Sequence, residues 1–139
     1  MDTTSGSTVA LSHGLAGYVH AVAEAVGVPA EGTSFEVSDT VTAYVALTPR
    51  LSGRPGRDLM LVWSEHSGWA IAVETRPTES SEVLAHLGGI APVPPPQVVA
   101  NFVEEVVAGR WTDQARPAFA RNREGLTDLV SSYLEATSE

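Results

Sequence analysis

The sequence predicts an α+β domain with two layers, in which a three- to four-stranded antiparallel sheet packs against one N-terminal helix and two C-terminal helices. Two observations support this fold class. Apolar residues recur at three- and four-residue spacing near both ends of the chain, as they do in amphipathic helices. The middle of the chain instead carries short apolar runs separated by glycine, proline and polar residues, which is typical of strands. Helices that flank such a group of strands cover an antiparallel sheet in two-layer domains.

The strongest strand pattern lies in residues 58–74, which predict a hairpin at the middle of the sheet. Two apolar runs flank the polar insert 64–68, and each run carries one tryptophan, Trp63 or Trp69. Gly68 is expected to adopt a positive φ in the connecting loop. The first strand is apolar on both faces, so we expect it to be covered on both sides or to lie at a dimer interface.

The other elements follow in chain order. Residues 12–26 predict a helix, with Ser12 as its N-cap and Gly27 as the glycine that ends it. Residues 1–10 are expected to be flexible, and residues 11–139 to form a single domain. The further expected elements are a short strand at 34–37, a strand at 41–47, a strand (or a helical turn) at 83–87, a helix at 97–108 and a helix from 115 or 117 to 136.

Composition narrows the classes of function. The chain has 139 residues, a formal net charge of −9 and no cysteine, so disulfides, thiol nucleophiles and cysteine-bound zinc are excluded. An acidic chain repels phosphate backbones unless its positive charge is segregated, so nucleic-acid binding is not expected. Its only support is a group of C-terminal arginines that alternate with acidic residues: Arg110, Arg116, Arg121 and Arg123.

No targeting or membrane segment is evident in the sequence. The N-terminal residues, MDTTSGSTVALSHG, contain neither a positively charged region nor a long apolar core. No apolar run reaches the roughly 18 residues that a membrane span needs. We therefore expect a cytoplasmic protein that does not bind membranes.

A metal site has one weak starting point. His20 and Glu24 lie four residues apart on the first predicted helix, so they share a face and could supply two ligands. A third ligand would have to come from His13, His66 or His86, and no spacing selects one of them. The exposed polar face of an amphipathic helix is the favoured interpretation, so we expect no metal and no other cofactor.

An acid/base pair is the only catalytic pattern in the sequence. Glu65 and His66 are adjacent in the predicted hairpin loop, where a carboxylate beside an imidazole could serve as an acid/base pair. Catalysis would also need a nucleophile or an oxyanion site, and no motif points to either. A solvated turn is therefore favoured, and we do not expect an enzyme unless its site has a non-standard arrangement.

Three arginines could bind an anion. Arg50, Arg54 and Arg57 share one loop rich in glycine and proline, where their guanidinium groups could hold a phosphate or a carboxylate. The spacing is not that of a phosphate-binding P-loop, and a solvated loop explains these residues equally well.

Three aromatic residues could line a ligand pocket. We favour core positions for Trp63, Trp69 and Tyr44. If their faces instead line a cavity, they would form an apolar pocket in which the indole N–H groups orient a ligand.

Parts of the chain resemble a known family. The segments are GLAGYVHAVAEAVGVP, TAYVALTPRLSGRPGRDLMLVWSEHSGWAIAVET, VLAHLGG and PPPQVVANFVEEVVAG. Over roughly Gly14 to Gly109 they resemble a family of small actinobacterial proteins of unknown function, and this resemblance implies no catalytic residues. The order of helix, strands and helix is also loosely similar to the YbjN-like and type III secretion chaperone folds. That second similarity implies a domain that binds proteins and is not an enzyme.

Two functions remain at the level of the sequence. We favour a non-catalytic protein-interaction or regulatory adaptor domain, which binds a protein partner or a second copy of itself. The alternative is a small-molecule sensor or enzyme, with a pocket beside the Trp63/Trp69 hairpin and the Arg50–Arg57 loop.

Overall fold

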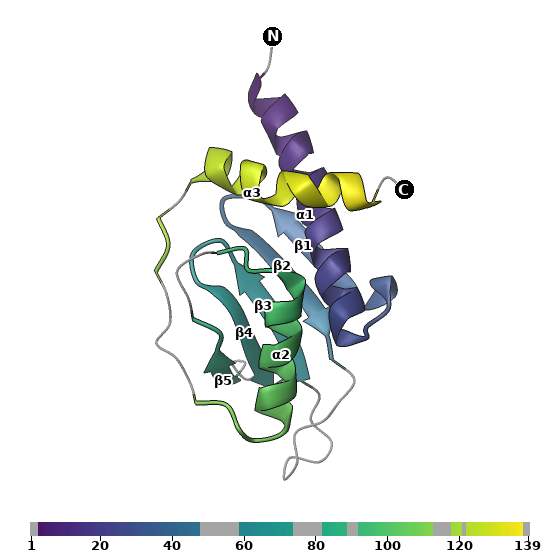
Figure 1. Cartoon of the computed structure of the whole chain (residues 1–139). Helices are drawn as coiled ribbons and strands as arrows, with labels where there is room; N and C mark the ends of the chain where they lie inside the picture. The colour runs from purple at the N-terminus through teal and green to yellow at the C-terminus, as the bar shows by residue number, and fades with distance from the viewer. Residues whose placement is uncertain are drawn as a thin grey trace.

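Five antiparallel strands form one sheet, in which each strand pairs with its neighbour in the chain (Figure 1). The computed structural model describes residues 3–47, 59–73, 82–88, 92–112, 118–120 and 122–137. The α+β prediction is confirmed, with five strands in place of the three to four expected. The elements are α1 (Thr3–Val26), the 3-10 helix η1 (Ala30–Gly32), β1 (Thr33–Val37), β2 (Val41–Ala46), β3 (Leu59–Ser64), β4 (Gly68–Val73), β5 (Glu82–His86), α2 (Pro96–Val107) and α3 (Arg123–Thr137).

The predicted hairpin is formed by β3 and β4, and β3 is the central strand. Trp63 and Trp69 lie directly opposite each other, with ring centroids 6.4 Å apart. Gly68 has the expected positive φ, at 72°. Alternate residues of β2 and β3 are buried, whereas every residue of β4 is buried. The core therefore lies on the sheet face that carries both tryptophans.

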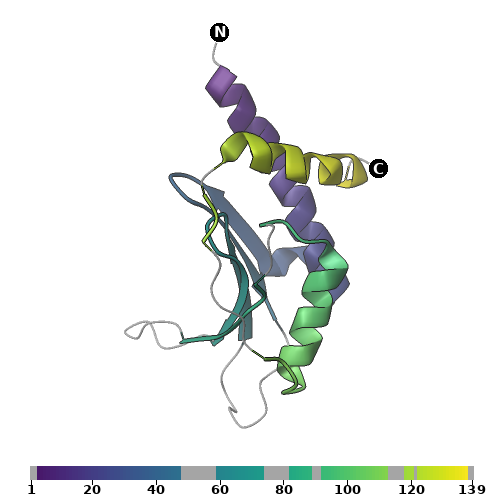
Figure 2. The same cartoon turned by 60° about the vertical axis from the view of Figure 1, so that its left-hand side comes forward.

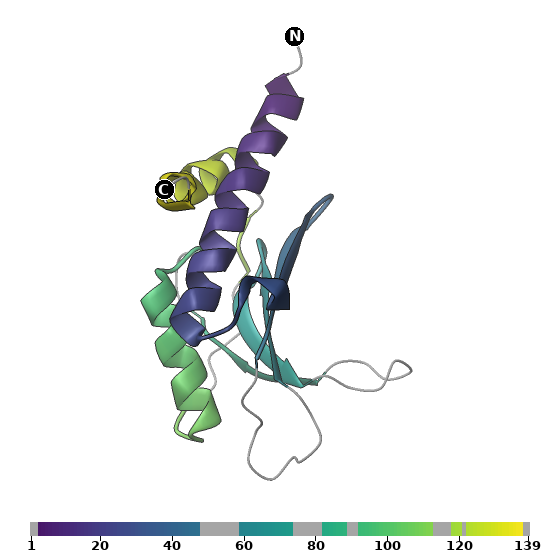
Figure 3. The ribbon, with the colours of Figure 1, turned by 90° about the vertical axis from the view of Figure 1, so that its right-hand side faces the viewer.

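The helices of the described chain lie on this same face of the sheet (Figures 2 and 3). α1 and α2 lie side by side, and α3 crosses α1 near the β1–β2 turn and the β3–β4 loop (Figure 1). Tyr18 of α1 and Phe102 of α2 are among the largest fully buried side chains. On the opposite face of β3, Met60 and Val62 are only half-buried. The two faces of the central strand therefore differ, although both are apolar in sequence.

The start of α1 differs from the prediction. The helix begins at Thr3, so Ser12 lies inside it and is not its N-cap. No proline stands in residues 3–11, so the helix can continue through them, and Leu11 is already buried at 2% exposed. α3 crosses α1 further along, where Gly14 lies against Val130. Ser12 therefore lies in the helix interior although its side chain suits an N-cap. Although α1 has 24 residues, no helix in the described part of the chain is long and apolar enough to cross a membrane.

The start of α3 also differs. We expected a helix from residue 115 or 117, but α3 begins at Arg123. Asn122 caps it, because its side-chain oxygen accepts a hydrogen bond from the backbone N–H of Gly125 at 2.9 Å. Phe119 lies before the helix, where its backbone N–H donates to the carbonyl oxygen of His66 at 2.8 Å. The segment before α3 is therefore tied to the β3–β4 loop. The other predicted strands and α2 agree with the structure to within one residue at each end.

Candidate functional site

Trp63 and Trp69 are core residues, 2% and 1% exposed. The indole N–H of Trp69 donates to the hydroxyl oxygen of Tyr18 at 3.0 Å, and Tyr18 in turn donates to the carbonyl oxygen of Pro94 at 2.5 Å. The indole N–H of Trp63 donates to the carbonyl oxygen of Pro92 at 2.7 Å. Residues 92–96, which we call the proline segment, therefore accept the hydrogen bonds that the buried aromatic cluster has to make.

The hydroxyl of Tyr18 is held in its protonated form. Burial raises the pKa of Tyr18 far above its ordinary value of 10.0; the hydrogen bond from Trp69 opposes this rise, and the electrostatic interaction with Tyr133 adds to it. A protonated phenol can both accept from Trp69 and donate to Pro94. The cluster is therefore a satisfied structural network.

Of the predicted ligand-binding residues that the structure describes, Trp63 and Trp69 lie together in the core and Tyr44 lies apart from them. Tyr44 alternates with buried residues in β2, so it lies on the sheet face opposite the tryptophans, where it is half-buried. Arg50, Arg54 and Arg57 lie outside the described residues. Neither tryptophan is in the lining of either of the two pockets reported below.

His20 and Glu24, the pair considered as metal ligands and not favoured, share a face of α1, and both residues are exposed. Within the residues that the structure describes, no group of three or more histidine, aspartate or glutamate side chains could hold a metal ion. The pair therefore has no third ligand in this part of the chain.

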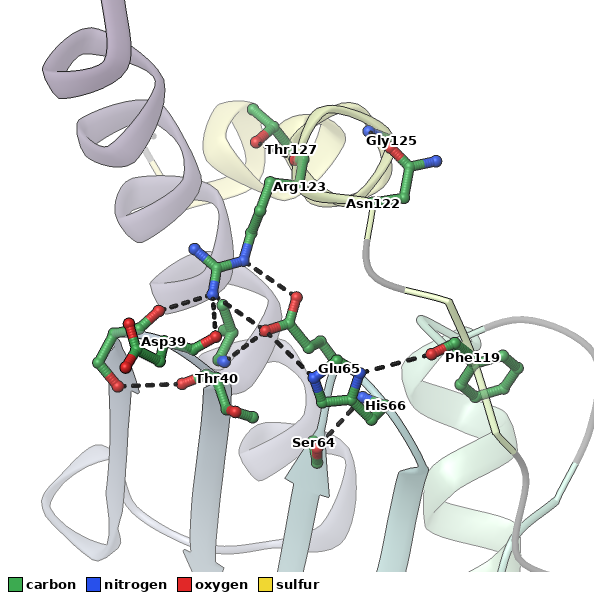
Figure 4. Close-up of polar contacts among 12 residues, drawn as sticks. Asp39, Thr40, Ser64, Glu65, His66, Phe119, Asn122, Arg123, Gly125 and Thr127 are labelled. Carbon is green, nitrogen blue, oxygen red and sulfur yellow. Dashed lines mark hydrogen bonds and ion pairs between the residues drawn. The ribbon is translucent and has the colours of Figure 1, made fainter.

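Glu65 is 4% exposed, although it lies in the hairpin loop (Figure 4). Arg123 donates to both of its carboxylate oxygens, at 3.0 Å each, and the backbone N–H of Val41 donates to one of them at 2.8 Å. The same guanidinium group donates to the carbonyl oxygens of Ser38 and Asp39, at 2.6 and 2.9 Å. We call these five residues the Glu65 clamp. It joins the β1–β2 turn, the β3–β4 loop and the first residue of α3.

Electrostatic interactions keep the carboxylate of Glu65 ionised. Burial alone would raise the pKa of Glu65, but the hydrogen bonds from Arg123 and Val41, with the charges of Arg123 and His66, outweigh it. The pKa of Glu65 therefore lies below its ordinary value of 4.5. A buried, ionised carboxylate that accepts two hydrogen bonds from one arginine forms a strong charge-assisted interaction.

His66 lies beside the clamp. Its Nε2 is 4.0 Å from a carboxylate oxygen of Glu65, and its Nδ1 is 3.4 Å from the carbonyl oxygen of Phe119. The side chain of His66 is 42% exposed. The two side chains considered as an acid/base pair are therefore close in space, but the carboxylate of Glu65 is already bound to Arg123 and Val41, and its burial does not fit the solvated turn that the sequence favoured.

A pocket of about 210 Å³ opens beside the clamp. Glu65 lies in its wall, and the rest of the lining is largely apolar and comes from Pro92, from the residues just before α3 and from the start of α3. Leu129, on its rim, is 46% exposed. The main lining residues are Glu65, Pro92, Phe119, Asn122, Leu126 and Leu129.

A larger groove of about 530 Å³ lies between the C-terminal half of α2 and the end of α1. We call it the α1–α2 groove. Its apolar lining is provided by Val26, Ala100, Val103 and Val107. Two exposed carboxylates, Glu24 and Glu104, and the guanidinium group of Arg110 complete it.

Charge in this groove is predominantly negative. Arg110 is paired with Glu105, with 2.7 Å between guanidinium nitrogen and carboxylate oxygen, so its charge is largely compensated. Glu24 and Glu104 remain in the lining. Both helices also end here, and the C-terminus of a helix carries a partial negative charge. The groove therefore favours a ligand with apolar and cationic parts.

Arg123 makes the most hydrogen bonds of the clamp residues, yet the sequence suggested it only as a possible contact to DNA. An arginine in a polar segment gives no sign of a partner 58 residues earlier in the chain. The nearest available signal was Asn122, which is a preferred N-cap residue and could have placed the start of α3.

Comparison with known proteins supports one part of the resemblance described above, namely that to a family of unknown function. The family DUF6292, described as a family of unknown function, matches residues 18–105, which is more than half of the chain. No curated protein and no solved structure matched the chain. The matched segment contains the whole sheet, most of α2 and the C-terminal part of α1, and it ends before α3. This protein therefore belongs to the DUF6292 family, a family of unknown function.

Proposed function

We propose that this protein is a non-catalytic interaction domain whose α1–α2 groove binds a short segment of a partner protein. The observation that carries the proposal is the groove itself, with its apolar lining and its two exposed carboxylates. The bound segment is expected to be helical or extended, with apolar side chains on one face and arginine or lysine beside them. A cytoplasmic location is part of the same proposal.

The size and lining of the groove support this function. Its volume of about 530 Å³ is in the usual range for ligand sites, which is roughly 300 to 1,000 Å³. Val103 is buried and Val107 is half-buried, so a partner side chain would meet an apolar surface between two helices. A groove between packed helices is a common site for a short amphipathic segment.

The charges support a basic partner. Glu24 and Glu104 lie in the groove of a chain with a formal net charge of −9. Such a field attracts cationic segments and raises their association rate. The same charges disfavour an acidic peptide or a nucleic acid.

The state of Glu65 supports a non-catalytic role. A general base needs a carboxylate or imidazole that is free to reach a substrate proton. The carboxylate of Glu65 instead accepts three hydrogen bonds within the clamp.

Photo-crosslinking tests the proposal in the full chain. Benzoylphenylalanine in place of Val107 lies in the groove, and the same residue in place of Glu36, which is exposed on β1, serves as the control. We expect a protein adduct at position 107 only, with the linked segment rich in apolar and basic residues. Equal adducts at both positions, or an acidic linked segment, would contradict the proposal.

The linked segment is then synthesised and titrated calorimetrically. We expect the double substitution Glu24→Arg/Glu104→Arg to weaken binding at least about tenfold, because each exposed charge pair contributes about 0.2–1 kcal/mol and reversal adds repulsion. The matched control, Glu36→Arg/Asp128→Arg, makes the same change in net charge at exposed positions outside the groove. If both double variants weakened binding of the segment equally, binding would depend on the net charge of the chain and not on the groove.

Native mass spectrometry distinguishes protein binding from the alternative function, which is binding of a small molecule. A mass gain of a few hundred daltons per chain, lost on denaturation, would assign the groove to a small molecule and overturn the protein-binding proposal. The same spectrum reports whether the chain is a dimer, which is the other partner that the sequence suggested.

A further inference from the structure

The partner of Glu65 comes from outside the segment that matches the family. Ser38, Asp39, Val41 and Glu65 all lie within residues 18–105, whereas Arg123 is the first residue of α3. The family segment therefore provides the oxygens of the clamp, and the later part of the chain provides the cation.

The arrangement of those oxygens is specific for a guanidinium group. Nε and Nη2 of Arg123 each donate to a different carboxylate oxygen of Glu65, both at 3.0 Å. Nη2 also donates to the carbonyl oxygens of Ser38 and Asp39. A planar fork of N–H donors matches two carboxylate oxygens, whereas a lysine ammonium group approaches as a point charge.

Without a cation the same residues would be unfavourable. With Arg123 in place the carboxylate of Glu65 is 4% exposed; without Arg123 it would keep one backbone donor, from Val41, and two carbonyl oxygens would face the same place. A buried charge without a partner is strongly destabilising. The matched segment therefore contains a site that needs a cation supplied by other residues.

The site is also open to solvent. Arg123 is 28% exposed, and the pocket of about 210 Å³ beside the clamp includes Glu65 in its wall. A second guanidinium group can thus approach the position that Arg123 occupies without passing through the core.

We propose that Glu65 and residues 38–41 form an arginine socket, a binding site for an alkyl-guanidinium group, and that Arg123 is its replaceable intramolecular occupant. α3 then acts as a competitor held on the same chain. The ligand is an arginine side chain of another protein segment or a small guanidinium compound, and the socket is separate from the α1–α2 groove.

Chemical rescue tests the socket in the full chain. Arg123→Ala vacates the socket, and ethylguanidinium is the added probe. We expect ethylguanidinium to raise the Tm of this variant by about 4 °C at ten times its Kd. Ethylammonium has the same charge without the fork and should give less than half of this rise.

The double variant Glu65→Gln/Arg123→Ala is the matched control, because it keeps the volume of residue 65 and removes its charge. Ethylguanidinium should leave its Tm unchanged. If Arg123→Ala does not fold, Arg123→Gln replaces it, since glutamine can still donate one hydrogen bond to Glu65. Equal effects of the two probes, or equal rescue of single and double variants, would overturn the socket.

Mixing two full-length variants identifies the source of the arginine. Glu65→Gln keeps Arg123 but lacks the charged socket, and Arg123→Ala keeps the socket but lacks the arginine. A mixed dimer in native mass spectra, with a Tm above that of Arg123→Ala alone, would show that a second copy can supply it. Rescue by ethylguanidinium without a mixed dimer would assign the socket to a free guanidinium compound or another protein. Absence of both would overturn the proposal.

Discussion

Trp63 is the residue whose truncation we expect to destabilise the fold most directly. It is 2% exposed at the centre of the sheet, and its indole N–H donates to Pro92. Trp63→Ala should lower the free energy of unfolding by about 3–5 kcal/mol, because it removes a large buried ring and leaves a cavity. Chemical denaturation measures the free energy of unfolding. Trp63→Phe is the control, because it keeps most of the aromatic ring. An unchanged unfolding midpoint for Trp63→Ala would place the side chain at the surface.

Tyr18 makes stability sensitive to alkaline pH. Its pKa is raised in the folded protein, so its contribution is fully present below pH 10.0 and is lost as the pH rises above that value, where only the unfolded phenol ionises. We expect stability to fall with a slope of up to about 1.4 kcal/mol per pH unit from this group. Urea titrations between pH 8 and 11 measure the slope. Tyr18→Phe should reduce it, and an equal slope in both proteins would contradict this assignment.

Glu65 makes stability sensitive to acid. Its pKa is depressed in the folded protein, so its contribution is present above the ordinary value of 4.5 and is lost as the pH falls through the lower folded pKa. Glu65→Gln should cost about 3 kcal/mol at pH 7, the lower end for a broken buried pair because Arg123 is partly exposed. It should also flatten the loss of stability between pH 5 and about pH 2. Thermal melts across this range report both effects, and an acid profile unchanged by the substitution would contradict the role of the clamp.

At the scale of elements, the docking of α3 depends on one close approach. A Cβ atom at Gly14 would lie 2.6 Å from Cγ2 of Val130 and 2.9 Å from its carbonyl oxygen. Glycine therefore allows α3 to cross α1 at this point, and the backbone oxygen cannot move aside as a flexible side chain could.

Gly14→Ala should displace α3 although alanine favours helices. We expect the clash to cost about 1–3 kcal/mol and the better helix propensity of alanine to offset about 1 kcal/mol of this, so that the free energy of unfolding falls by up to about 2 kcal/mol. Hydrogen exchange should become faster in α3 and stay slow in β3 and β4. The control is Ala16→Ser, which changes a half-buried position of the same helix. Gly27→Ala would be unsuitable as a control, because Gly27 has a φ of 81°. Unchanged exchange in α3 would show that the two helices can separate slightly at no cost.

At the scale of the whole molecule, the net charge of −9 should make partner binding depend on salt. The partner segment identified by crosslinking to the α1–α2 groove should bind about tenfold more weakly when the NaCl concentration rises from about 50 to 500 mM, because salt screens exposed charges over shorter distances. Glu24→Gln/Glu104→Gln should bind with a flatter salt dependence, measured by calorimetry. Identical salt slopes for this variant and the parent chain would remove these carboxylates from the interface.

The fold class, the hairpin and the core aromatic pair could be predicted from the sequence. Residues 59–63 and 69–73 are short apolar runs on either side of a polar insert, and residues 15–26 and 98–107 have a period of 3.6, so both patterns can be read from neighbouring residues alone. Glycine at position 68 likewise follows from a local backbone requirement. Membership of the DUF6292 family adds no chemistry to these elements.

Only the tertiary structure decided where α3 lies, why Glu65 is buried and how the α1–α2 groove forms. Glu65 and Arg123 are 58 residues apart in the chain, and each alone reads as an ordinary solvated charge. The groove likewise needs the end of α1 beside α2. Local sequence determines the faces and turns of elements because those depend on neighbouring residues, whereas the charged and concave sites arise from contacts between distant elements.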